Sequence, residues 1–163
     1  MPYIKLITIL FVLLVLTHVT FVLLMVGGVH LLELQNNIPY QDTHKSNIIK
    51  SLIMLPFGVI FETYVFQVIT FFAFGRGKKT FSPKKYIFWS SLLFGLAHIT
   101  LIDNIVFIVD ILQNIMHFFS GIIYATTYYL MKKRKNNAFL SVASIHFLYD
   151  LCIVSAIWFS TAK

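Results

Sequence analysis

The sequence contains few charged residues. Asp, Glu, Lys and Arg make up 12% of its 163 residues, about half the share of an ordinary soluble domain. Hydrophobic residues account for 58% of the chain, aromatic residues for 17%, and the mean hydropathy is +0.82. This balance excludes a water-soluble globular domain and fits a membrane protein that crosses the bilayer several times.

Cysteine is nearly absent as well. The single cysteine, Cys152, excludes an intramolecular disulfide and any Cys-x-x-Cys metal site. The sequence also has no repeat at a fixed period and no coiled-coil heptad pattern. We therefore expect one integral membrane domain over residues 1–163.

Most of the sequence consists of long apolar segments. Their length and the lack of strict alternation favour α-helices over a transmembrane β-barrel. The sequence thus predicts an all-α bundle of about five spans. The segments are about Ile4 into the Leu31–Leu34 region, Ile48–Phe74, Tyr86–Ile102, about Ile111–Met131 and Ala138–Phe159.

Basic residues are clustered between these segments. Five lie in the stretch Arg76–Lys85 and four in Lys132–Lys135, each after an even-numbered span. The positive-inside rule places both stretches, and the N-terminus, on the cytoplasmic side. The net charge of +7 is then a topology signal, with the lipid bilayer as the partner and no nucleic acid.

One acidic residue lies deep inside an apolar segment. Glu62 is the only charged residue between Lys50 and Arg76. A carboxylate at the centre of a membrane helix costs about 2.5–3.5 kcal/mol on insertion scales. Such a residue points to a function that needs it.

Three further polar residues are predicted to lie at a similar depth. At a rise of about 1.5 Å per residue, Glu62 and His98 lie about 20 Å from the nearest basic residue, His146 about 16 Å and Asp150 about 22 Å. His146 and Asp150, four residues apart, share one helix face. The four side chains are therefore expected to meet at one site. A single membrane histidine such as His117 is instead interpreted as a packing residue.

Two chemistries suit these residue types. In one, Glu62 is a general base that activates water with help from His98, while His146 and Asp150 stabilise the developing oxyanion. In the other, Glu62, His98 and His146 hold a divalent metal with one position open for water. The residue types alone permit either mechanism.

At these residues the sequence resembles the CPBP family of intramembrane proteases, which includes the glutamate-type CAAX prenyl endopeptidase. The family's Phe-x-x-x-His motif is present as "FGLAH", Phe94 to His98. Its His-x-x-x-Asn/Asp motif is present as "HFLYD", His146 to Asp150. The resemblance covers about residues 50–155, a protease-like core.

The family's first motif, Glu-Glu-x-x-x-Arg, is altered here to "ETYVFQ". Glu62 matches the first glutamate, whereas Thr63 and Gln67 stand at the positions of the second glutamate and the arginine. The two changes remove both charges together and leave a neutral pair that can still hydrogen-bond. We interpret Thr63, Gln67 and Phe94 as supporting residues of the site.

The resemblance implies an endopeptidase that cleaves a peptide or membrane-protein substrate, with Glu62, His98, His146 and Asp150 as catalytic residues. It favours a metal-independent glutamate mechanism with no cofactor, although a divalent metal is an alternative. A short chain of this type is similar to bacterial members, which implies the bacterial cytoplasmic membrane. The loss of the second Glu and the Arg favours an alternative: a non-catalytic protein of the same fold, acting in bacteriocin self-immunity or as a sensor-binding scaffold. A proton translocator is a third hypothesis, weakened by the absence of an inverted repeat.

Overall fold

The computed structural model describes residues 3–31, 45–75, 81–99 and 107–161, and this part of the chain is all helical. The segment 45–75 is one continuous helix with a π-helical stretch in its middle. The elements are α1 (Tyr3–Leu31), α2 (Lys45–Glu62), the π-helix η2 (Thr63–Ile69), α3 (Thr70–Gly75), α4 (Pro83–Ala97), α5 (Phe107–Lys133) and α6 (Ala138–Thr161).

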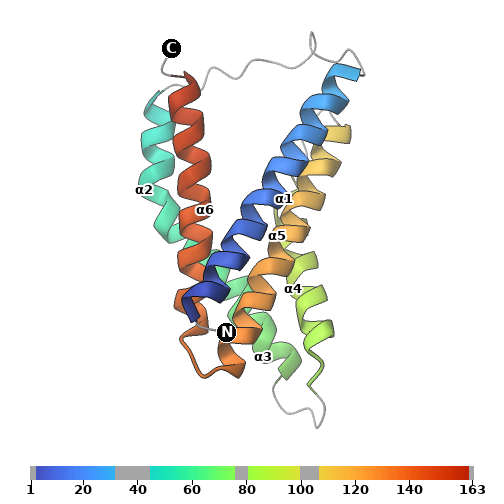
Figure 1. Cartoon of the computed structure of the whole chain (residues 1–163), viewed down its shortest axis with the longest axis vertical. Helices are drawn as coiled ribbons and strands as arrows, with labels where there is room; N and C mark the ends of the chain where they lie inside the picture. The colour runs from blue at the N-terminus through green and yellow to red at the C-terminus, as the bar shows by residue number, and fades with distance from the viewer. Residues whose placement is uncertain (1–2, 32–44, 76–80, 100–106, 162–163) are drawn as a thin grey trace.

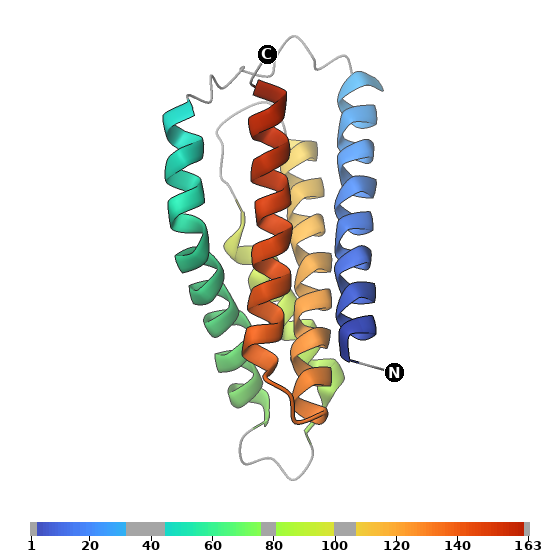
Figure 2. The same ribbon diagram turned by 60° about the vertical axis from the view of Figure 1, so that its left-hand side comes forward.

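The helices form an up-and-down bundle. Figure 1 shows α2 beside α6 in one part of the bundle, and α1, α5 and α4 side by side in the other. In Figure 2, α6 lies between α2 and α5, and the helices alternate in direction along the chain. The helix α5 packs against α4, α1 and α6. It therefore contributes to joining the two parts, as do the contacts of α1 with α6 and of η2 with α4.

Three of the described helices are long and apolar enough to cross a membrane by length and composition. The corresponding segments are Tyr3–Leu24, Ile49–Phe74 and Ala138–Ala156. The helix α4 differs from the expected span Tyr86–Ile102, because it ends at Ala97 after 15 residues. At about 1.5 Å per residue it is shorter than a hydrocarbon core of about 30 Å. A helix of this length ends before it has crossed such a core.

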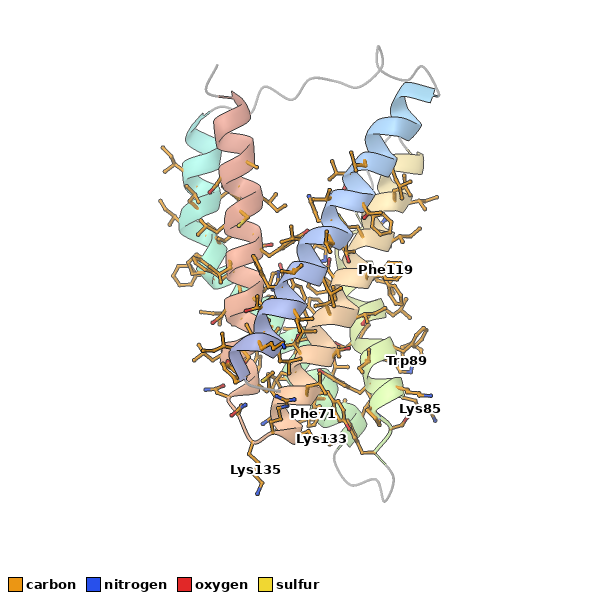
Figure 3. All side chains as sticks on the ribbon, in the orientation of Figure 1. Phe71, Lys85, Trp89, Phe119, Lys133 and Lys135 are labelled. Carbon is orange, nitrogen blue, oxygen red and sulfur yellow. The ribbon has the colours of Figure 1, made fainter. Side chains whose placement is uncertain are left out.

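Local signals explain where the last helices begin. The Ser82 side chain accepts a hydrogen bond from the backbone N–H of Lys85, and Pro83 occupies the first turn of α4. The Asn137 side chain accepts a hydrogen bond from the backbone N–H of Leu140 at the start of α6. Figure 3 shows Lys85, Lys133 and Lys135 at the same end of the bundle. The basic residues of both clusters that the structure describes thus share one side.

The helices α4 and α5 approach each other closely through small residues. A Cβ atom added to Gly121 would lie 2.9 Å from the Cα atom of Ser91 and 3.3 Å from the Cβ atom of Phe94. A Cβ atom added to Gly95 would lie 3.3 Å from backbone atoms of Phe118. Ser91 and Gly95 of α4 form a small-x-x-x-small pair, as do Gly121 and Ala125 of α5, and this spacing permits close contact between helices.

The π-helix η2 is joined to α4 by buried hydrogen bonds. The side-chain oxygen of Gln67, which is 1% exposed, accepts hydrogen bonds from the hydroxyls of Tyr86 at 3.1 Å and Ser90 at 2.9 Å. The Ser90 hydroxyl lies 2.6 Å from the carbonyl oxygen of Phe66 as well. These contacts fix η2 against the first half of α4.

We expect Gln67→Leu to lower the stability of the protein in detergent by about 1–2 kcal/mol, because it leaves the buried Tyr86 hydroxyl without its side-chain acceptor. Thermal unfolding followed by circular dichroism measures the loss. In a double-mutant cycle, Tyr86→Phe should cost much less in the Gln67→Leu background than in the wild type. Equal costs in both backgrounds would contradict this coupling.

Candidate active site

Glu62 is the last residue of α2 and directly precedes the π-helix. Its side chain is 29% exposed, and its Oε2 atom faces two histidines from different helices. The distance from Oε2 to Nε2 of His98 is 3.7 Å, and to Nε2 of His146 it is 3.6 Å. The structure thus brings Glu62 between α4 and α6.

His98 follows the last turn of α4 and is held by its own helix. Its Nδ1 atom lies 2.7 Å from the carbonyl oxygen of Phe94. Because a carbonyl only accepts, Nδ1 donates this hydrogen bond and carries the proton in the neutral ring. The Nε2 atom that faces Glu62 is then free to accept a hydrogen bond.

His146 and Asp150 lie one turn apart on α6. The Nε2 atom of His146 is 3.3 Å from the Oδ2 atom of Asp150, and the His146 side chain is 6% exposed. This nitrogen therefore lies between two carboxylates, those of Glu62 and Asp150.

Aromatic rings surround the two histidines. Phe94, which is 3% exposed, has its ring centroid 4.5 Å from that of His98 and 5.8 Å from that of His146. His117 of α5 stacks on His98, with centroids 4.1 Å apart and planes 19° apart. Tyr124, also of α5, lies against His146 with a centroid distance of 4.5 Å. These contacts restrict how either imidazole can turn.

Two of these neighbours were not among the residues predicted for the site. His117 was interpreted as a packing residue, and Tyr124 was not singled out. Both lie on α5, which carries no family motif. The spacing of seven residues puts His117 and Tyr124 on the same face of α5, and this is the only signal in the sequence that could have indicated them together.

Two buried hydroxyls near the site lack hydrogen-bond partners. Among the described residues, Thr63 Oγ1 and the Tyr124 hydroxyl are both buried and unpartnered. Thr63 directly follows Glu62, and Tyr124 packs against His146. An unpartnered buried polar group costs about 1–3 kcal/mol. Such groups beside the Glu62 carboxylate are candidates for contacts with a bound molecule or water.

The supporting residues Thr63 and Gln67 have different roles in the structure. The two side chains are 2% and 1% exposed, but Gln67 forms its hydrogen bonds with Tyr86 and Ser90 of α4. Thr63 Oγ1 has no partner in the described chain. The charged pair that the family pattern would place here is thus replaced by a helix-to-helix contact and a single free hydroxyl.

The residue types at this site are also those that bind divalent metals. In the described ranges, no group of three or more His, Cys, Asp or Glu side chains is arranged so that it could hold a metal ion. The donor atoms of Glu62, His98 and His146 do not form a ligand set as the structure places them.

Comparison with protein families gives one match. Residues 44–152 match the family model described as "Type II CAAX prenyl endopeptidase Rce1-like", which is about two thirds of the chain. The match begins at the start of α2 and ends within α6, so it contains all four residues of the candidate site. The comparisons with curated proteins and with solved structures gave no match.

Proposed function

The chain belongs to the Rce1-like family of type II CAAX prenyl endopeptidases, and on that premise we propose that it is an intramembrane endopeptidase that uses Glu62 to activate water. One observation carries the proposal: the Glu62 carboxylate faces the Nε2 atoms of His98 and His146 at 3.7 and 3.6 Å. A carboxylate and two imidazoles from three helices meet where lone polar residues would be penalised.

The spacing suits a water molecule. Separations of 3.6–3.7 Å exceed a direct hydrogen bond, and they let one water oxygen lie about 2.8 Å from both atoms of a pair. The water donates one hydrogen to the Glu62 carboxylate and the other to Nε2 of His98. Its lone pair is then directed away from both and toward a peptide carbonyl carbon.

The reaction follows from this arrangement. Glu62 takes a proton from the water as the oxygen bonds to the carbonyl carbon, and the carbonyl π electrons move to the carbonyl oxygen. The Nε2–H of His146 donates a hydrogen bond to the resulting oxyanion. When the carbon–nitrogen bond breaks, Glu62 returns the proton to the leaving amine, so the carboxylate is regenerated.

The carboxylate of Asp150 has a positioning role in this scheme. At 3.3 Å from Nε2 of His146, it favours the imidazole tautomer that carries the proton on that nitrogen. In its ionised form it does not itself donate, because an ionised carboxylate only accepts hydrogen bonds. His146 therefore supplies the donor, and Asp150 keeps the proton on the nitrogen that faces Glu62.

We further propose the bacterial cytoplasmic membrane as the location, with α1 beginning on the cytoplasmic side. The positive-inside rule supports this orientation, since Lys85, Lys133 and Lys135 lie at the end of the bundle where α1 begins. The substrate is a peptide or protein segment that reaches the site from the bilayer.

Hydrolysis of a quenched peptide library by the purified protein in detergent tests the proposal. We expect wild type to cleave, and His98→Ala and His146→Ala to lose at least about 100-fold in rate. Activity should survive a divalent-metal chelator, since no step uses a metal. Loss of activity on chelation, with recovery when one metal is returned, would contradict the metal-independent mechanism.

A second candidate function has one observation in its favour. The side chain of Gln67, at the position of the family's arginine, is used in hydrogen bonds to Tyr86 and Ser90. A non-catalytic membrane protein of the same fold, acting in bacteriocin self-immunity or as a sensor-binding scaffold, would need no charge at this position. Full cellular function of a Glu62→Gln protein would favour that candidate over the protease.

A further inference from the structure

The Tyr124 hydroxyl is a buried donor without a partner. The residue is 1% exposed, and its hydroxyl forms no hydrogen bond within the described chain. Its ring is fixed on two sides, with centroids 4.5 Å from that of His146 and 5.6 Å from that of Phe94. A rigid, desolvated hydroxyl of this kind retains its full capacity to donate to a bound group.

The surroundings of this hydroxyl are those of the site. The ring of Tyr124 lies against the imidazole of His146. The Nε2 atom of that imidazole is 3.6 Å from the carboxylate of Glu62 and 3.3 Å from that of Asp150. No other side chain of α5 in the described part of the chain combines full burial, contact with His146 and an unpartnered hydroxyl.

The proposed mechanism needs such a group. An oxyanion next to two carboxylates must be stabilised by donors, and the scheme above supplies only the Nε2–H of His146. When it is ionised, the carboxylate of Asp150 adds negative charge close by, which opposes formation of the oxyanion. A second, neutral donor would compensate without a further buried charge.

We propose that the Tyr124 hydroxyl is this second donor and hydrogen-bonds to the oxyanion that forms on the peptide carbonyl, beside Nε2–H of His146. This inference rests on the proposed function and adds a catalytic residue to it. Preorganised donors aimed at a developing oxyanion act only in the transition state. The hydroxyl should therefore affect kcat far more than KM.

The conservative variant Tyr124→Phe isolates the hydroxyl, because it retains the ring contacts with His146 and Phe94. We expect kcat to fall by about 100-fold or more, with KM within about twofold of wild type. The melting temperature should stay equal or rise, because no hydrogen bond within the protein is lost. The matched control is Tyr128→Phe, one turn further along α5, where the ring packs against Phe71 and Tyr86; its kcat should be unchanged.

Each other outcome overturns the inference. If Tyr124→Phe keeps wild-type kcat while Glu62→Gln is inactive, the proposed function stands and Tyr124 is not a donor in it. If Tyr124→Phe lowers the melting temperature and Tyr128→Phe does not, the hydroxyl has a structural partner and the role proposed here is wrong. If Glu62→Gln cleaves as well as wild type, the proposed function fails and this inference fails with it.

Discussion

Glu62→Gln is expected to lower the rate of peptide hydrolysis about 10²- to 10⁴-fold while leaving the fold intact. The amide has nearly the shape of the carboxylate but cannot take a proton from water, so the general base is removed. Folding should not suffer, because the carboxylate forms no hydrogen bond shorter than 3.5 Å with its two histidine neighbours. Loss of a buried ionisable group inside a membrane helix should even favour the folded protein slightly.

The measurement is the single-turnover rate of a quenched peptide, together with the melting temperature of the same preparation. Glu62→Asp is a useful companion, because it keeps the carboxylate but withdraws it by one methylene, and a partial rate should remain. A Glu62→Gln protein that hydrolyses peptide at the wild-type rate would show that another group activates the water.

Gly121→Val is expected to destabilise the bundle by at least about 1–3 kcal/mol, the usual cost of overpacking. Any Cβ at this position would lie 2.9 Å from the Cα atom of Ser91. The nearest atom belongs to backbone, so the helices α4 and α5 would have to separate. Because His98 directly follows α4 and Tyr124 follows Gly121 by three residues, such a separation would also disturb the site.

Thermal unfolding in detergent and the yield of folded protein measure this effect. Gly58→Ala is the matched control, since a Cβ atom added at Gly58 meets nothing within 4 Å. That substitution should be neutral or stabilising, because alanine is the better helix former. An equal melting temperature for Gly121→Val and Gly58→Ala would contradict the close approach of α4 and α5 at Gly121.

Much of the fold could be predicted from the sequence because hydropathy reports directly on burial in a bilayer. The all-helical bundle is confirmed, and the described helices coincide with the five apolar segments to within a few residues at most ends. The main difference is α4, which ends at Ala97 although apolar residues continue to Ile102. Hydropathy measures how well a segment tolerates lipid, and it carries no information on where a helix stops inside a bundle.

The depth of the four site residues in the membrane could be predicted by counting residues along each helix. The structure links the four side chains by three successive contacts of 3.3–3.7 Å. Their roles in catalysis stay a prediction. The side chains that α5 contributes to the site could not be predicted in this way. Depth along an axis does not say which way a side chain points, so neither the stack of His117 on His98 nor the free hydroxyl of Tyr124 was foreseeable.

The hydrogen-bond partners of Gln67 could not be predicted from the sequence either. A spacing of four residues suggested that Thr63 and Gln67 could pair on an α-helical face. The segment is instead a π-helix, and Gln67 bonds to α4. The intrinsic preference of a helical segment is for the α form, with hydrogen bonds between residues four apart. Whether it instead forms π-type bonds between residues five apart therefore depends on the neighbouring helices.

The π-helix also has a consequence for how this chain could have been assembled. Each π-type ring encloses one more residue than an α-type ring, so η2 accommodates one surplus residue without a loop. In an α-helix, one residue corresponds to a turn of about 100° about the axis. Deleting a single residue from 63–69 would restore a regular helix and rotate Glu62 by that angle relative to α3. The direction in which the carboxylate faces His98 and His146 therefore depends on the π-helical register of residues 63–69.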